Sequence, residues 1–313
     1  MRKHSAGKQV AMAHRARRAW FAISGATLVV ATAGCGDITN LRQSNPGQLS
    51  AATLYVPGNA QLLVNGAISD FECAYSRYVV GTGILGDELI NAISNTANFD
   101  YDRRTLPTNG AYGTNTCASG NQQPAIYSTL STARGSADTV LAKLQGWTVA
   151  QVPNRTKLIG QAAAYAGYSL VLLGESMCSG AINVGPELTP VQLFNEAKLR
   201  FDAAIPAATT ATDTATLNLA LLGRARTQLD LGNAAAAATD AAAIPPTFVA
   251  NMSTDPVNPR RQNFVFIATS QSFWASVDPS FRDLTIGGAP DPRVLVTNTA
   301  KNGTANIPIW TAN

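Results

Sequence analysis

The sequence predicts a mainly α-helical protein built from tetratricopeptide-like helical hairpins, with long loops and little β structure. Three features of residues 156–245 predict this fold class: apolar residues at steps of three and four, capping residues at the expected helix starts, and short turns between helices. Turns this short force neighbouring helices to be antiparallel, and abundant alanine lets helix axes come close. We therefore expect stacked hairpins that share one buried core.

The first two helices of this helical-repeat core follow from apolar spacing. Six residues recur at alternating steps of four and three, which places them on one side of a helix: Ile159, Ala163, Ala166, Leu170, Leu173 and Met177. The second helix has Thr189 as its N-cap and Pro190 as its first residue, and its apolar stripe runs from Phe194 to Ala204. We expect Pro206 to end it.

Two further helices complete the core. The third begins after Asp213 and carries an apolar stripe of Leu222, Ala225 and Leu229 to a turn at Gly232. The fourth takes in the alanine-rich residues 234–243 and ends at two consecutive prolines.

The flanking regions are less regular. On the N-terminal side, apolar spacing predicts a helix from Asn59 that Gly81 and Gly83 interrupt, then a long loop over residues 91–123, then a helix from Pro124 to Gly146. Residues 246–313 form a loop-rich C-terminal part. Within it, Asn263–Ala268 fits either a short strand or a buried helical turn.

Residues 1–34 have the pattern of a lipoprotein signal peptide. Six basic residues and no acidic residue precede an apolar run over residues 19–31, and small residues precede Cys35. We therefore expect lipidation of Cys35, a polar tether over residues 35–57, and a single domain over residues 58–313. The alternative is an uncleaved membrane anchor, but the apolar run is shorter than the ~20 residues that a spanning helix needs. Whether Arg17 and Arg18 direct twin-arginine export is left open.

The charge of the protein changes when this segment is removed. Six of the 23 Lys and Arg residues lie in residues 1–34, which leaves 17 against 19 Asp and Glu. The high isoelectric point belongs to the signal segment, so no basic surface predicts a nucleic-acid partner. Both histidines, His4 and His14, also lie there. The rest of the chain therefore lacks the imidazole that Ser-His-Asp catalysis and the usual zinc sites need.

An enzyme without histidine would have to rely on carboxylates, as glycoside hydrolases do. The candidates are Asp87, Glu88, Glu175 and Glu187, which lie where helix ends and caps are expected. We expect no catalytic role, no cofactor and no metal site.

Three cysteines follow Cys35, namely Cys73, Cys117 and Cys178. An exported protein meets an oxidising environment, which favours one disulfide and one remaining thiol. The spacing does not decide which two pair, although Cys117, in a loop, is the favoured member. The absence of a CxxC pair argues against metal binding.

Several segments together resemble the SusD/RagB family of outer-membrane nutrient-binding lipoproteins. They are the sequence around Cys35, Leu62–Ala67, Asp87–Leu89, Ala162–Tyr165, Leu172–Glu175, Thr189–Ile205, Leu222–Asn233 and Asp291–Val294. The resemblance covers nearly all of residues 35–310, and the order and spacing of the segments carry it. It implies a protein on the cell surface whose helical pairs contact a TonB-dependent transporter and whose loops bind a glycan, or an oligopeptide. Members usually continue beyond the equivalent of Trp310, so the chain resembles a C-terminally truncated member.

Sugar binding needs flat aromatic rings and groups that hydrogen-bond to hydroxyls. Five residues in the loop-rich parts have this chemistry and are our candidate ligand contacts: Tyr101, Arg103, Tyr112, Trp274 and Phe281. We expect Trp147 and Trp310 to be packing residues. The alternative function is a periplasmic helical-repeat scaffold without a small ligand, and the long loop and aromatic-rich tail favour ligand binding over it.

Overall fold

The computed structural model describes residues 49–105, 117, 124–258 and 260–312. The chain divides into two compact units, residues 1–54 and residues 55–313. Of the first unit the structure describes α2 (Ala51–Leu54) and the two residues before it, so the predicted signal peptide and Cys35 lie outside the described residues. All other described helices and strands belong to the second unit.

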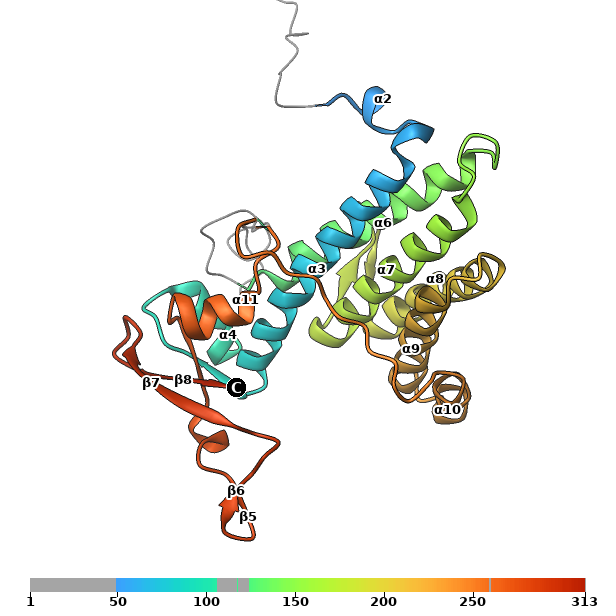
Figure 1. Ribbon diagram of the computed structural model, residues 1–313. Coiled ribbons are helices and arrows are strands. Elements are labelled where there is room, and N and C mark those ends of the chain that lie inside the picture. Colours follow the sequence, from blue (N-terminus) through green and yellow to red (C-terminus); the bar gives the residue numbers. More distant parts are fainter. Residues whose placement is uncertain (1–48, 106–116, 118–123, 259, 313) are drawn as a thin grey trace, which may run out of the picture. The chain divides into compact units, whose positions relative to one another are not determined.

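The second unit is mainly helical, which confirms the predicted fold class (Figure 1). Six helices form three pairs that follow one another in the chain: α3 (Ala60–Leu85) with α6 (Ile126–Gly146), α7 (Arg155–Ser176) with α8 (Pro190–Thr210), and α9 (Thr214–Asp230) with α10 (Ala234–Ala242). Each helix contacts its partner, and each pair contacts the next. The caps act as the sequence predicts: Thr189 and Gln192 form a capping box, and Asp213 caps α9.

The first helices of the three pairs, α3, α7 and α9, run in the same direction. Phe71 of α3 contacts Tyr165 and Tyr168 of α7, and seven residues later Tyr78 contacts Glu175. The same two residues of α7 also contact α9: the Tyr168 hydroxyl donates to the Leu219 backbone oxygen, and Glu175 binds Arg226. The contacts advance by seven residues, about two turns, along each of the three helices, so the helices are parallel and in register.

α7 is the central helix, and it is buried on most sides rather than along one stripe. It contacts α3, α6, α8 and α9. The predicted stripe is buried from Ala163 to Leu173, but so are residues between its members, such as Ala164 and Leu172. Four neighbouring helices leave this helix only a narrow polar strip, which includes Tyr165, Tyr168 and Glu175, and its alanines and glycines let those neighbours come close.

Pro206 does not end α8, contrary to the prediction, because the helix continues to Thr210. Ala204 and Ala208 flank the proline and are fully buried. A Cβ atom at Gly160 of α7 would lie 3.2 Å from the backbone nitrogen of Ala208, so the two helix backbones meet closely here. This packing compensates for the one backbone hydrogen bond that proline removes.

Gly81 and Gly83 do not break α3 either, because the helix runs through both to Leu85. A Cβ atom at Gly81 would lie 2.5 Å from Cδ1 of Ile126, and one at Gly83 would lie 3.2 Å from Leu89. These glycines let α6 and the following strand approach α3, so their role is packing.

The predicted stripe on α9 is also wrong in part. Ala225 is buried, but Leu222 is 44 % exposed and Leu229 is 61 % exposed. The helix instead buries the side that contains Gly223, where a Cβ atom would collide with the ring of Phe201. The absence of a side chain at Gly223 thus decides which face of α9 packs on the core.

The remaining elements are short. The predicted loop of residues 91–123 contains a helix, α4 (Thr96–Arg103), and residues 263–268 are helical, in α11 (Phe264–Phe266) and the π-helix η2 (Ile267–Gln271). The 3-10 helices are η1 (Pro57–Asn59) and η3 (Pro279–Phe281). Four antiparallel pairs of strands join β1 (Leu89–Asn91) to β4 (Ala275–Val277), β2 (Gly180–Ala181) to β3 (Glu187–Leu188), β5 (Thr285–Ile286) to β6 (Ala289–Pro290), and β7 (Val296–Asn302) to β8 (Pro308–Ala312).

Pairing between β1 and β4 brings the C-terminal part back to the end of α3. Leu89 lies opposite Val277, and Ser276 Oγ donates a hydrogen bond to Pro308 O and accepts one from Trp310 N. Within the described residues, no helix has the length and apolarity that crossing a membrane requires.

Candidate functional site

Two of the five predicted ligand contacts are wrong because their side chains are buried. Tyr101 is 2 % exposed, and its hydroxyl accepts a hydrogen bond of 3.3 Å from the Ile126 backbone nitrogen. Trp274 is fully buried, and its ring packs 5.2 Å from that of Phe264. Both residues lie outside the long paired helices, and their large rings fill space in the core between segments that are distant in the sequence. Neither ring can stack on a ligand at the surface.

The other predicted contacts lie on separate elements. Arg103 ends α4, with its guanidinium carbon 4.9 Å from the centre of the Phe99 ring. Phe281 is half-buried at the end of η3. Tyr112 lies outside the described residues. Of the two tryptophans expected to pack, Trp147 is half-buried after α6, and Trp310 is half-buried with Arg282 5.3 Å above its ring.

The structure shows which two of the three cysteines form the disulfide, a choice that the sequence left open. Cys73 of α3 is bonded to Cys117, and Cys178 is exposed with a free thiol. The disulfide therefore attaches a segment of the predicted loop to the middle of α3. Among the described residues, no group of three or more potential ligands is placed to hold a metal ion.

The four candidate carboxylates are also dispersed. Asp87 pairs with Arg104 at 2.6 Å on the surface, and Glu187 is exposed in β3. Glu88 lies beside Gly83, near the end of α3. Glu175 is the one of these residues that takes part in a larger cluster, and that cluster lies on helices rather than in loops.

The cluster begins with aromatic residues on α3 and α7. Phe71, Tyr75 and Tyr78 are spaced so that all three lie on one face of α3, and their rings are stacked, with centres 6.0 Å and 6.4 Å apart. Tyr165 of α7 meets Phe71 edge-on at 5.3 Å, and Tyr168 lies 6.0 Å from it. Phe71 is buried, and the four tyrosines are each half-buried. Burial raises the pKa of Tyr165 to about 12, so these phenols stay protonated at neutral pH.

Charged side chains from α7 and α9 complete what we call the tyrosine–carboxylate cluster, namely Tyr75, Tyr78, Glu175, Arg226 and Asp230. The Tyr78 hydroxyl donates a hydrogen bond of 2.7 Å to Glu175 Oε2. Arg226 binds the same carboxylate with two nitrogens, Nε at 2.5 Å from Oε1 and Nη2 at 2.6 Å from Oε2. This two-point pair fixes the carboxylate, so it presents the same orientation to the surface at all times.

Asp230, one turn after Arg226, is exposed at the edge of this cluster. Partial burial raises the pKa of Asp230 to about 6, and repulsion by Glu175 and a hydrogen bond with it act in the same direction. The cluster therefore combines half-buried rings, an arginine–carboxylate pair and one further acid whose pKa is raised to about 6. Rings and groups of these kinds bind small polar molecules at protein surfaces.

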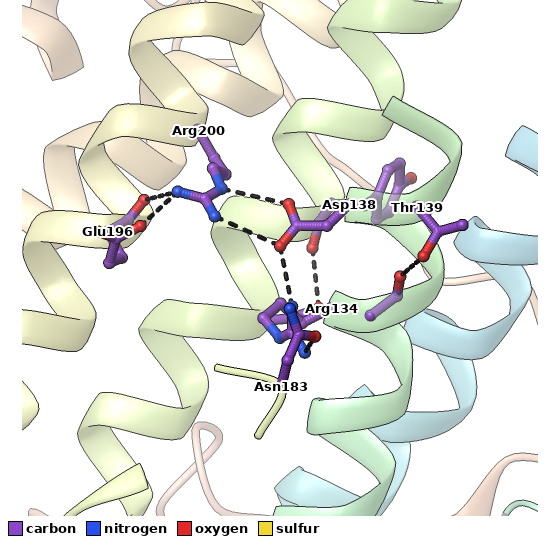
Figure 2. Close-up of polar contacts among 9 residues, drawn as sticks. Arg134, Asp138, Thr139, Asn183, Glu196 and Arg200 are labelled. Carbon is purple, nitrogen blue, oxygen red and sulfur yellow. Dashed lines mark hydrogen bonds and ion pairs between the residues drawn. The ribbon is translucent and has the colours of Figure 1, made fainter. Parts of the chain in front are cut away.

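A second cluster of charges, shown in Figure 2, has a structural role. Asp138 of α6 accepts from Arg134 of its own helix at 3.0 Å and from Arg200 of α8 at 3.2 Å, and Arg200 also binds Glu196 at 2.5 Å. Burial lowers the pKa of Arg200, but its interactions with Asp138 and Glu196 together outweigh this effect and raise the pKa. Arg134 is buried and also donates to Asn183, in the connection between β2 and β3. Two positive and two negative groups thus join α6 to α8 with no net charge.

No protein-family model, no curated protein and no solved structure matches the chain.

Sequence reasoning missed the tyrosine–carboxylate cluster because it looked for ligand contacts in loops. A signal was present, because Phe71, Tyr75 and Tyr78 follow helical spacing. Three large aromatic residues on one face, two of them with hydroxyls, are more than a core helix needs. What the sequence does not contain is the register that places Glu175 and Arg226 next to them.

Proposed function

We propose that this protein is a lipid-anchored outer-membrane lipoprotein that binds a glycan or an oligopeptide and delivers it to a TonB-dependent transporter. The observation that carries the binding part is the tyrosine–carboxylate cluster, because half-buried rings beside an arginine–carboxylate pair suit the capture of a polar nutrient. The lipid anchor, the surface location and the transporter follow from the sequence pattern at Cys35 and from the resemblance to the SusD/RagB family.

The helical pairs provide surface for a protein partner. Leu199 of α8 and Leu222 and Leu229 of α9 are 57 %, 44 % and 61 % exposed. Each of these leucines contributes apolar surface that a partner protein could cover. The same leucines also suit the alternative function, a periplasmic scaffold without a small ligand, so they do not separate the two.

Binding is tested first with glycan and peptide arrays probed by the full chain in detergent. We expect signals on one of the two arrays, and we expect Tyr75→Ala to reduce them because it removes half of the stacked ring pair. Phe266→Ala is the matched control, since Phe266 is 57 % exposed and lies in α11, outside the cluster. Equal signals for the two variants would contradict binding at this cluster. Absence of signal on both arrays would contradict the proposed function.

Anchoring and orientation need separate measurements. We expect metabolic labelling with a palmitate analogue to mark the wild-type protein and to leave Cys35→Ser unmarked. Protease added to intact cells should degrade the wild-type protein if it faces the exterior, whereas a periplasmic scaffold would be protected.

A further inference from the structure

The β5–β6 hairpin is exposed along its whole length. Every residue from Asp283 to Pro290 is exposed, including the large apolar residues Leu284 at 36 % and Ile286 at 53 %. No charged residue lies between Leu284 and Pro290. Figure 1 shows the hairpin extending away from the paired helices of the second unit. Its tip is therefore an uncharged, apolar projection.

The hairpin is fixed at its base and at its turn. At the base, the Asp291 backbone nitrogen donates a hydrogen bond of 2.8 Å to Leu284 O, and the buried Asp291 carboxylate accepts from Arg293 at 2.8 Å and 3.0 Å. At the turn, Gly287 and Gly288 have φ angles of 60° and 85°, which a two-residue turn of this kind requires. Leu284 and Ile286 are two positions apart, so their side chains lie on one face of the ribbon. The chain thus holds two apolar side chains outward in a defined position.

The residues before the hairpin suit the boundary between water and lipid. Arg282 donates a hydrogen bond of 2.9 Å to Val277 O, and its guanidinium lies 5.3 Å above the half-buried ring of Trp310. Tryptophan rings and long basic side chains are favoured at the level of lipid headgroups, where one end is apolar and the other is wet. The apolar tip and this base therefore follow the order of polarity at a membrane surface.

A lipid surface fits this tip better than a protein does. A stable protein interface takes about 20–30 residues from each side, and the exposed hairpin offers the eight residues of Asp283–Pro290. Lipid needs no matching shape, and apolar side chains that enter the boundary between headgroups and acyl chains leave water. The backbone groups of the tip would stay at the headgroup level, where water can still bond to them.

We infer that the β5–β6 hairpin inserts Leu284 and Ile286 into the surface of the membrane that carries the protein. This inference rests on the proposed lipid anchor and adds a second contact with the same bilayer. Cys35 precedes Tyr55 by 20 positions, and a chain of this length spans at most about 70 Å, so an anchored second unit stays close to lipid. One flexible attachment does not define how that unit faces the membrane, whereas a second contact does.

The test measures contact between the hairpin and lipid, with the full chain reconstituted into phosphatidylcholine vesicles. Ile286→Trp adds a fluorescent ring at the tip, and Val257→Trp is the control, because Val257 is 85 % exposed in the connection between α10 and α11. Subtracting the emission of the wild type isolates the added ring from the native tryptophans. When the lipid carries bromine atoms, which quench by contact, we expect the Ile286→Trp ring to lose roughly half of its fluorescence and the Val257→Trp ring to lose none.

A second pair of variants tests whether the native side chain is needed. We expect the ring added by Leu284→Trp to be quenched as well, because it lies on the same face as Ile286. Adding Ile286→Asp to Leu284→Trp should remove that quenching, since a carboxylate at the tip is costly to bring into lipid. Quenching that persists in the double variant would contradict insertion of the tip.

Flotation of the wild type with the same vesicles tests the anchor separately. If the wild type floats and the Ile286→Trp ring is not quenched, the inference is overturned while the anchor stands, and a protein rather than lipid is what covers the hairpin. Equal quenching of Ile286→Trp and Val257→Trp would also overturn the inference, because the contact would not be specific to the hairpin. If the wild type does not float, the proposed anchor fails and the inference fails with it.

Discussion

Tyr78 on α3 donates its hydroxyl hydrogen bond to Glu175 on α7, at 2.7 Å, and the same carboxylate binds Arg226 on α9. One acid thus connects the first helices of all three pairs. Burial raises the pKa of Tyr78, and its hydrogen bond to Glu175 raises it further. The hydroxyl therefore remains a donor at every pH at which the protein is used.

Removing this hydroxyl should weaken the fold. We expect Tyr78→Phe to lower the free energy of unfolding by about 1–2 kcal/mol, because a hydrogen bond to a charged acceptor is lost. Tyr75→Phe is the control, since the described residues include no hydrogen-bond partner for the Tyr75 hydroxyl. Urea denaturation followed by circular dichroism measures both variants. Equal losses would show that the bond to Glu175 contributes nothing specific.

Replacing Asp138 should lower the free energy of unfolding more than replacing a surface acid does. In Asp138→Ala, Arg134, whose side chain is 5 % exposed, and Arg200 lose their shared carboxylate. We expect a loss of about 2–4 kcal/mol, because removing one partner leaves buried positive charge uncompensated. Asp87→Ala breaks a pair whose side chains are 62 % and 52 % exposed, so it should cost less than about 0.5 kcal/mol. Chemical denaturation of the two variants would contradict this account if their losses were similar.

Substitution of alanine at two glycines of α3 should change the free energy of unfolding in opposite directions. At Gly81 the new methyl group would lie 2.5 Å from the side chain of the fully buried Ile126, so we expect a loss of about 1–3 kcal/mol. Gly66 is exposed in the same helix and has no atom within 4 Å of the added Cβ, so Gly66→Ala should gain about 0.5–1 kcal/mol. Midpoints of thermal unfolding test both signs. A stabilising Gly81→Ala would refute the packing role of that glycine.

The disulfide should contribute to stability as a constraint on the unfolded chain. Cys73 and Cys117 are 44 residues apart, and we expect Cys117→Ser to lower the free energy of unfolding by about 2–4 kcal/mol. Cys178→Ser should have little effect, because the thiol is exposed and free. Reducing agent should lower the free energy of unfolding of the wild type to that of Cys117→Ser, and it should not change the free energy of unfolding of that variant. A wild type unaffected by full reduction would contradict this prediction.

Much of the helical core could be predicted because its signals are local. The N-caps Thr189 and Asp213 and the glycine turn at Gly232 lie next to the backbone groups that they affect, so the starts and turns of α8, α9 and α10 follow from a few neighbouring residues. Predictions of helix ends from neighbouring residues were wrong where a segment distant in the sequence packs against the helix. α8 passes Pro206 because α7 packs on both sides of it, and α3 passes Gly81 because Ile126 needs the space.

The candidate site shows the same division. The position of both histidines within residues 1–34, and the presence of three cysteines after Cys35, are properties of the sequence alone, and they limit the chemistry available to residues 35–313 before any fold is known. Burial is not such a property: Tyr101 and Trp274 have the chemistry of ligand contacts, but Ile126 and Phe264 enclose them.

By itself, then, the sequence determined the helical class, the pairing of consecutive helices and the lack of imidazole after residue 34, since each depends on residue type or on residues a few positions apart. Only the tertiary structure decided which cysteines join, which aromatic rings reach the surface, and that Tyr78, Glu175 and Arg226 meet. The physical reason is the large separation along the sequence between the residues in contact. Those contacts join residues 44 to 148 positions apart, and they form only when whole helices pack in one register.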